Sequence, residues 1–233
     1  MEWGFPENFS TFGDSIDATY GAIFYVTAIA FVVVQGLLIY CIIRYRHREG
    51  RKALPIHGNT RLEIIWTVIP AIGVLSVAYL SASVWLDIKD ESRFPGGAYE
   101  VGLHASQFEW NVTNPGPDGA LGTDDDFPTR NALHVPVDQP VRVLLTAEDV
   151  IHSFFLPNFR VKQDAVPGME IPVWFEAIAP GVFDLGCAEL CGLGHYRMRG
   201  TLTVHSPEDF EAWQAEEGGV ASGTAETPTV AAR

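Results

Sequence analysis

Two long runs of uncharged, mostly apolar residues dominate the first half of the chain. Residues 21–43 contain no charged side chain, and neither do residues 64–86. Each run exceeds the roughly 20 residues that an α-helix needs to cross a hydrocarbon core about 30 Å thick. Two buried helices of a soluble protein are the alternative, but such helices rarely stay uncharged for so long. The pattern therefore predicts two transmembrane helices, at 21–43 and 62–86.

The start of the second helix carries a local capping signal. Thr60 and Glu63 have the spacing of a capping box, in which the hydroxyl and the carboxylate satisfy free backbone N–H groups. Pro70 is expected to kink this helix mildly, which membrane helices tolerate. The first run is too long for a cleavable signal peptide and follows acidic rather than basic residues. We therefore expect both helices to remain as a hairpin.

From residue 98 onward, short apolar segments alternate with Pro and Gly. The predicted strands are residues 99–103, 108–112, 132–135, 141–146, 153–155, 171–176, 181–185 and 200–204. Short strands at this spacing are typical of a β-sandwich or barrel. A short helix is expected at Pro207–Gln214 with Ser206 as its N-cap, and the small, polar residues 218–233 are expected to be disordered.

The predicted organisation is that of a membrane-anchored chain, α-helical first and all-β afterwards. Its parts are an external arm (1–20), a transmembrane helix (21–43), a basic loop (44–61), a second transmembrane helix (62–86), a linker (87–97), a β-domain (98–206), and a short helix with a disordered tail (207–233).

Charge indicates how the hairpin is oriented. The loop between the helices is strongly basic, through Arg44, Arg46, Arg48, Arg51, Lys52 and Arg61. Because basic loops stay on the cytoplasmic side, both termini and the β-domain are expected on the external, periplasmic face of the cell membrane. The whole chain has a net charge of −14, and the acidic excess lies in this external part. It should repel nucleic acid and attract a basic protein partner.

The segment from Cys187 to Met198 carries the candidate chemistry. Two thiols, the imidazole of His195 and a thioether fall within twelve residues. Thiolate and thioether are soft ligands, and this combination favours copper over magnesium, calcium or manganese. His152 lies upstream at the edge of a predicted strand and can supply a second imidazole.

Three other interpretations of this segment remain open. A zinc site could use the two Cys and two His, although it would leave Met198 without a role. A mononuclear blue copper site needs only one Cys. A disulfide between Cys187 and Cys191 would close a very short loop and leave both histidines unused. The second thiolate instead favours two bridging sulfurs between two copper ions. Such a centre would relay single electrons and bind no substrate.

At this point the sequence resembles subunit II of the haem–copper cytochrome c oxidases. The resemblance extends from about Tyr20 to Phe210. It rests on the helix hairpin and on the motifs at residues 62–70, 149–153, 161–168 and 187–198. It implies a cupredoxin-like, Greek-key external domain that carries the dinuclear copper centre called CuA.

The resemblance also implies roles for individual residues. Cys187 and Cys191 would bridge the coppers, His152 and His195 would each bind one, and Met198 and the carbonyl of Glu189 would be weaker ligands. The Glu189 side chain would reach a magnesium ion shared with subunit I. Glu63 matches a carboxylate at the cytoplasmic mouth of a proton path. Its alternative role is to cap its own helix, and the two roles are compatible.

This chain departs from the family pattern near the place where electrons enter. The family carries Gln-Trp-aromatic-Trp, whereas this chain has Gln107, Phe108, Glu109 and Trp110. Phe108 therefore occupies the position of the tryptophan nearest the donor, and Trp110 matches the second tryptophan. Ordinary strand packing is the alternative for both. Met169 stands where many relatives carry Arg. The acidic insertion at 114–126 could hold calcium, but it lacks the spacing of an EF-hand, which favours a solvated turn.

The function expected from this resemblance is that of the electron-accepting subunit of a proton-pumping terminal oxidase. Electrons would arrive from a cytochrome c or a cytochrome-bearing complex and pass through copper to haem in subunit I, where oxygen becomes water. The expected partners are subunits I and III, the donor and membrane lipid. A nitric oxide reductase subunit with the same relay, a membrane-tethered copper carrier and a copper-free quinol oxidase subunit are the rival interpretations. The intact ligand set argues against the last.

Overall fold

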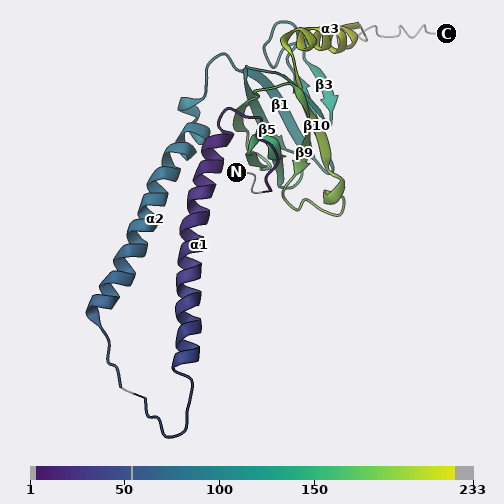
Figure 1. Cartoon of the computed structure of the whole chain (residues 1–233). Helices are drawn as coiled ribbons and strands as arrows, with labels where there is room; N and C mark the ends of the chain where they lie inside the picture. The colour runs from purple at the N-terminus through teal and green to yellow at the C-terminus, as the bar shows by residue number, and fades with distance from the viewer. Residues whose placement is uncertain (1–3, 54, 224–233) are drawn as a thin grey trace, which may run out of the picture. The chain divides into compact units, whose positions relative to one another are not determined.

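The computed structural model describes residues 4–53 and 55–223. Its contacts divide the chain into two units, one formed by residues 15–87 and the other by residues 1–14 together with 88–233. The first unit contains the two long helices and the second contains the β-domain (Figure 1). Each unit is described by itself below.

The helical unit consists of two helices that are long and apolar enough to span a membrane, α1 (Gly13–Arg44) and α2 (Thr60–Lys89). Their apolar windows bury no residue against the rest of the chain, as expected for helices that face lipid. Both extend beyond the predicted spans. α1 begins at Gly13, so the arm predicted at 1–20 is already helical in its last part, and α2 ends at Lys89 rather than at residue 86.

The cap of α2 differs from the prediction. Asn59, not Thr60, is the N-cap: its side-chain oxygen accepts hydrogen bonds from the backbone N–H groups of Arg61 (3.1 Å) and Leu62 (3.2 Å). Asparagine is one of the strongest N-cap residues, and Thr60 becomes the first residue of the helix. Glu63 lies in the first turn, where a carboxylate favours the positive end of the helix dipole.

The β-domain is a sandwich of two five-stranded sheets. One sheet has the order β3 (Phe127–Arg130), β2 (Glu109–Asn114), β1 (Tyr99–Ser106), β5 (Pro140–Ala147) and β8 (Ile171–Glu176). The other has the order β4 (Ala132–Pro136), β10 (Arg199–His205), β9 (Gly181–Cys187), β6 (His152–Leu156) and β7 (Val161–Ala165). Figure 1 shows the labelled strands of both sheets. The predicted fold class is confirmed.

Strict alternation of buried and less buried residues along β1 and β5 places one face of their sheet against the core. β1 and β5 pair in parallel, with Leu103 opposite Leu145, whereas β9 and β10 pair antiparallel. The largest fully buried side chains include Trp110, Phe127, Phe154, Phe159 and Phe175. This core is the rigid frame on which the loops of the domain are mounted.

Two strands were not predicted. β7 contains Lys162, Gln163 and Asp164 and lies at a sheet edge, so it has little apolar pattern. β3 contains Pro128 and is the edge strand of the other sheet, where a residue without an N–H group is tolerated. The strand predicted from residue 108 begins one residue later, at Glu109.

The segment before α1 is bound to the β-domain rather than being an irregular arm. Phe9 donates its N–H to the carbonyl of Asn158 (2.9 Å) and accepts from Ile178 (3.0 Å), and Ser10 forms an isolated bridge with Ala177. The hydroxyl of Ser10, 1% exposed, donates to the carbonyl of Phe159 (3.0 Å). This segment therefore belongs to the β-domain unit, as the linker after α2 does.

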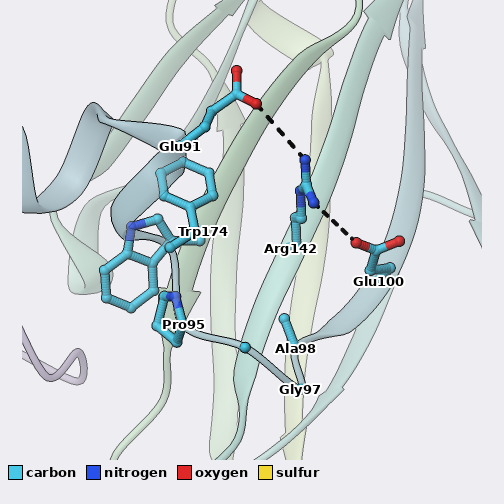
Figure 2. Close-up of a pocket in the computed structure, with 9 residues that line it drawn as sticks. Glu91, Pro95, Gly97, Ala98, Glu100, Arg142 and Trp174 are labelled. Carbon is cyan, nitrogen blue, oxygen red and sulfur yellow. Dashed lines mark hydrogen bonds and ion pairs between the residues drawn. The ribbon is translucent and has the colours of Figure 1, made fainter.

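The linker after α2 forms a short 3-10 turn, η1 (Glu91–Arg93), and lines a cavity of about 320 Å³. Figure 2 shows Arg142 of β5 between two carboxylates on its wall. The Arg142 guanidinium lies 3.2 Å from Glu100 and 3.8 Å from Glu91. The ring of Trp174 packs against Phe94 at 6.1 Å between centroids. These contacts fasten the linker to the domain.

A C-terminal helix, α3 (Pro207–Gly223), packs on the domain and is longer than predicted. The disordered tail was predicted from residue 218, but the helix continues to Gly223; residues 224–233 lie outside the described part of the chain. Trp213 stacks on His134 at 4.4 Å between ring centroids, and His134 Nδ1 lies 2.8 Å from His205 Nε2. This aromatic stack joins α3 to β4 and β10.

The histidine pair makes the domain sensitive to acid. Burial is the main cause, and the charge of His205 the second, of a pKa of His134 lowered to about 4. Burial also lowers the pKa of His205, although Asp209 opposes this. The unfolded chain therefore binds more protons than the folded one below pH ~6.5, and stability falls as the pH drops from there toward 4. Because both rings are partly exposed to solvent, which weakens the effect, we expect the free energy of unfolding to fall by about 1–2 kcal/mol.

Near-ultraviolet circular dichroism of the full chain during denaturant unfolding, at several pH values, measures this loss. The variant His134→Phe keeps a ring against Trp213 but cannot be protonated, so it should lose less stability over the same pH range. Parallel pH profiles for the two chains would contradict the assignment.

Candidate metal centre

The segment from Cys187 to Met198, here called the ligand loop, connects β9 to β10. The two strands pair antiparallel up to the ends of the loop, with Gly186 opposite Arg199. The N–H of Cys187 donates to the carbonyl of Met198 at 3.3 Å. This pairing brings the first and last residues of the loop together. A short 3-10 turn, η3 (His195–Arg197), closes the loop.

Four side chains of the loop converge. Cys187 Sγ lies 3.9 Å from Cys191 Sγ, which is far longer than a disulfide bond of about 2.05 Å, and both thiols are free. Cys191 Sγ also lies 3.5 Å from His195 Nδ1 and 3.7 Å from Met198 Sδ. The disulfide interpretation is therefore not the arrangement found.

The fifth side chain comes from another strand. His152, the first residue of β6, is fully buried, and its Nδ1 lies 3.1 Å from Met198 Sδ and 4.0 Å from Cys187 Sγ. The carbonyl oxygen of Glu189 lies 3.3 Å from Cys187 Sγ. Each thiol thus has a different imidazole near it: His152 near Cys187, and His195 near Cys191.

The donor set fits a soft metal. The ligand atoms of His152, Cys187 and Cys191 lie within 4.8 Å of one another, and Met198 and Cys191 are 1% and 2% exposed. Lone pairs gathered in a buried space favour a cation that is shared among them, and thiolate and thioether select copper or zinc over hard cations. Met198 is in contact with both His152 and Cys191, a placement that a four-ligand zinc site would not use.

Asp149 orients one of the imidazoles. Its Oδ1 lies 2.8 Å from His152 Nε2, which leaves Nδ1 of the same ring to face the sulfur atoms. Burial tends to raise the pKa of Asp149, but hydrogen bonds from His152, Val150 and Gln107 outweigh it, and the pKa lies below its usual value. The carboxylate therefore stays ionised as an acceptor. Sequence reasoning did not assign Asp149 a role; its position three residues before His152 was the available signal.

The pKa of the Cys191 thiol is raised to about 11, mainly by burial and secondly by the charge of Cys187. Without a cation in the site this thiol therefore carries its proton at neutral pH. Metal binding must displace that proton, because the thiolate is the form that coordinates.

The two aromatic residues that were predicted to mark the point of electron entry differ in their burial. Trp110 is fully buried, with its ring edge-on to His152 (6.3 Å between centroids) and to Phe154 (6.2 Å). Trp110 therefore cannot touch a donor protein directly. Phe108 is partly buried and lies against the ligand loop: a Cβ atom placed on Gly194 would meet its ring at 2.4 Å.

The remaining candidates lie outside the cluster of donors. The Glu189 side chain is exposed, Met169 is 54% exposed, and Glu63 belongs to the helical unit. In the acidic insertion, Asp118 accepts from the N–H of Ala120 and Asp126 from that of Gly122, each at 2.8 Å. These carboxylates are committed to local turns.

A β-sandwich whose loop gathers thiols, imidazoles and a thioether, preceded by two apolar helices, defines a membrane-anchored cupredoxin-like protein. Comparison with known families agrees. Residues 1–84 match the model of the cytochrome c oxidase subunit II transmembrane domain, and residues 118–204 match that of its periplasmic domain. The chain therefore belongs to the cytochrome c oxidase subunit II family, whose members are part of haem–copper terminal oxidases.

Two relatives support this membership. The chain is 35% identical to the alternative cytochrome c oxidase subunit 2 of Bradyrhizobium diazoefficiens, over 87% of this chain and 80% of that protein. It is 31% identical to cytochrome c oxidase subunit 2 of Thermostichus vulcanus, over 93% and 79%. Among solved structures, the periplasmic domain of subunit II of cytochrome oxidase from Bradyrhizobium japonicum is 29% identical, with a TM-score of 0.49, covering 55% of this chain and 98% of that one.

Proposed function

We propose that this chain is the electron-accepting subunit of a proton-pumping oxidase and that it holds a dinuclear copper centre. Its ligands are Cys187 and Cys191 as bridges, His152 and His195 as terminal imidazoles, and Met198 and the Glu189 carbonyl as weaker donors. The observation that carries the proposal is the second thiol: two Sγ atoms 3.9 Å apart, each with its own imidazole. When bound, the copper pair supplies a one-electron relay.

The chain itself contributes rigidity and exclusion of water. β6 and β9 pair directly, with Phe154 opposite Cys187, so the strand that carries His152 is fixed to the start of the ligand loop. The antiparallel β9–β10 ladder fixes the other end. Buried, tightly held ligands change position little when the charge of the site changes, which keeps the reorganisation small.

The exposed surface around the loop suits a protein partner. Leu190, Leu193 and Tyr196 are 78%, 96% and 73% exposed, and exposed apolar side chains gathered beside a redox centre favour protein contact over solvent. The chain as a whole is strongly acidic. We propose a basic, c-type cytochrome as the donor and subunit I, which carries the haem, as the acceptor. Subunit III and membrane lipid complete the expected surroundings.

Trp110 and Phe108 then serve the transfer from different positions. Trp110 lies beneath the surface, in edge contact with His152. It can therefore support electron transfer through its contact with this ligand, without touching the donor protein. Phe108 contributes its ring to the wall of the ligand loop. The exposed carboxylate of Glu189 is proposed to bind magnesium at the boundary with subunit I, since carboxylate oxygens are the ligands that this ion prefers.

Rapid mixing of the purified oxidase with a reduced c-type cytochrome tests the function. The optical bands of the copper centre should change before those of haem, and oxygen should be consumed. Reduction of haem while the copper bands stay constant would contradict the relay. If the enzyme reduces nitric oxide and not oxygen, the chain is instead a subunit of a nitric oxide reductase.

Glu63 is proposed to admit protons from the cytoplasmic side, which fits the basic loop that precedes it and the positive-inside rule. Replacing Glu63 by alanine should slow proton uptake by the oxidase several-fold and leave the copper content unchanged. Glu49→Ala, which removes a carboxylate from the same loop, is the matched control and should have no effect. Equal uptake rates in the two variants would remove this role from Glu63.

A further inference from the structure

The ligands of the proposed copper centre come from two separate segments. His152 begins β6, whereas the other side-chain ligands lie on the ligand loop. Their relative position decides the geometry of the site. One residue that belongs to neither segment contacts both: Gln107, in the turn between β1 and β2.

Gln107 binds the ligand loop through its side chain and the His152 segment through its main chain. Its Nε2 donates to the carbonyl of Cys191 at 2.5 Å. Its backbone N–H donates to Asp149 Oδ2 at 2.8 Å, and Asp149 Oδ1 lies 2.8 Å from His152 Nε2. A continuous chain of three polar contacts therefore runs from Cys191 to His152.

The ligand loop is shaped to receive this turn. Gly192 has a φ of +135°, which L-residues rarely adopt, and a Cβ atom there would lie 2.7 Å from Gln107 Nε2. On Gly194, a Cβ atom would lie 2.4 to 2.7 Å from three atoms of the Phe108 ring. The two glycines thus leave the space that the Gln107 amide and the Phe108 ring occupy.

We propose that Gln107 is a positioning residue for the copper centre, which holds the peptide of Cys191 and, through Asp149, the ring of His152 in one fixed relation. A hydrogen bond to the carbonyl of Cys191 restrains the backbone that carries a bridging thiolate. The Asp149 oxygen 2.8 Å from His152 Nε2 restrains the opposite imidazole. Phe108 acts beside it as packing, a role different from contact with the donor. The proposal rests on the proposed function, since it presumes that the loop binds copper.

The consequence is a change in copper binding and spectrum that a role confined to folding would not produce. Loss of outer contacts of this kind costs about 10- to 100-fold in metal affinity or activity. Gln107→Leu removes the amide but keeps the backbone N–H to Asp149, so it isolates the contact with Cys191. Gln107→Asn keeps an amide but shortens its reach, and should change the site in the same direction.

The experiment uses the full chain, purified in detergent and loaded with copper. Copper per chain, the electron paramagnetic resonance spectrum and the rate of copper loss to a chelator are measured, together with the thermal unfolding of the copper-free chain. The control is Gln214→Leu, because Gln214 also donates to backbone carbonyls, those of Pro115 (3.0 Å) and Gly116 (3.3 Å), outside the ligand loop.

We expect both Gln107 variants to lose copper about 10-fold faster than the wild type or more, with altered hyperfine splitting and unchanged unfolding of the copper-free chain. Gln214→Leu should match the wild type in copper loss and spectrum. Wild-type copper loss and spectrum in both Gln107 variants would overturn the positioning role while leaving the copper centre intact. A lowered unfolding temperature with a wild-type spectrum would also overturn it, because it would show a purely structural role. A wild-type chain that binds no copper pair would instead refute the proposed function.

Discussion

Replacing Cys191 by serine is expected to destroy the proposed dinuclear centre while leaving the domain folded. A serine hydroxyl is a hard donor that stays protonated at neutral pH and cannot replace a thiolate bridging two soft metal ions. The thiol of Cys191 lies 3.5 Å from His195 Nδ1 and 3.7 Å from Met198 Sδ, so its loss removes a point where several ligands meet. We expect at most one copper per chain and electron transfer slowed by more than about 100-fold, the upper range for loss of an outer contact alone.

Copper quantification and the rate of oxidation of a reduced c-type cytochrome measure this effect in the assembled oxidase. Cys41→Ser is the matched control, because it makes the same chemical change on α1, at an exposed position outside the site. It should retain full copper and full rate. Two coppers and a normal rate in Cys191→Ser would show that Cys191 is not a bridging ligand.

Replacing Trp110 by alanine is expected to cause the largest loss of stability. Trp110 is fully buried between the sheets and packs edge-on against both His152 and Phe154. Its indole N–H has no hydrogen-bond partner among the described residues, so the cost is that of an emptied core site, about 3–5 kcal/mol. Because the cavity would adjoin His152, the copper spectrum should broaden as well.

Denaturant unfolding of the copper-free chain measures the loss, with Trp213→Ala for comparison. Trp213 is only partly buried, on α3, so its removal should cost less and leave the copper spectrum unchanged. Equal costs for the two variants, or an unchanged spectrum in Trp110→Ala, would contradict the placement of Trp110 beneath the ligand.

Much of the architecture follows from local patterns, and the exceptions have physical reasons. The uncharged runs locate the two helices but not their ends, because charged residues such as Asp14 and Lys89 continue a helix freely once it has left the hydrocarbon. β7 escaped prediction because three polar residues, Lys162, Gln163 and Asp164, interrupt it. Only the residues at its two ends are buried apolar ones, so the strand has no clear alternation of apolar and polar positions. The binding of Phe9 and Ser10 to the β-domain depends on partners about 150 residues away in sequence, which no local pattern records.

The metal site also has one part that the sequence predicts and another that only the fold shows. Cys187, Cys191, His195 and Met198 are neighbours in sequence, and their residue types alone predict the chemistry. The contact between Gln107 and Cys191 depends on the β1–β2 turn meeting a loop 84 residues further along, so only the assembled sheets reveal it. Trp110 and Phe108 have similar side chains, yet one points into the core and the other lies on the ligand loop, a difference set by their position relative to the start of β2.

The most direct test of the copper centre is copper counting combined with electron paramagnetic resonance on the purified full chain. The arrangement of two thiols, each with its own imidazole, predicts two coppers per chain and a seven-line hyperfine pattern, because one unpaired electron is shared equally by two copper nuclei. Bound zinc, or a single copper with a four-line pattern, would contradict it.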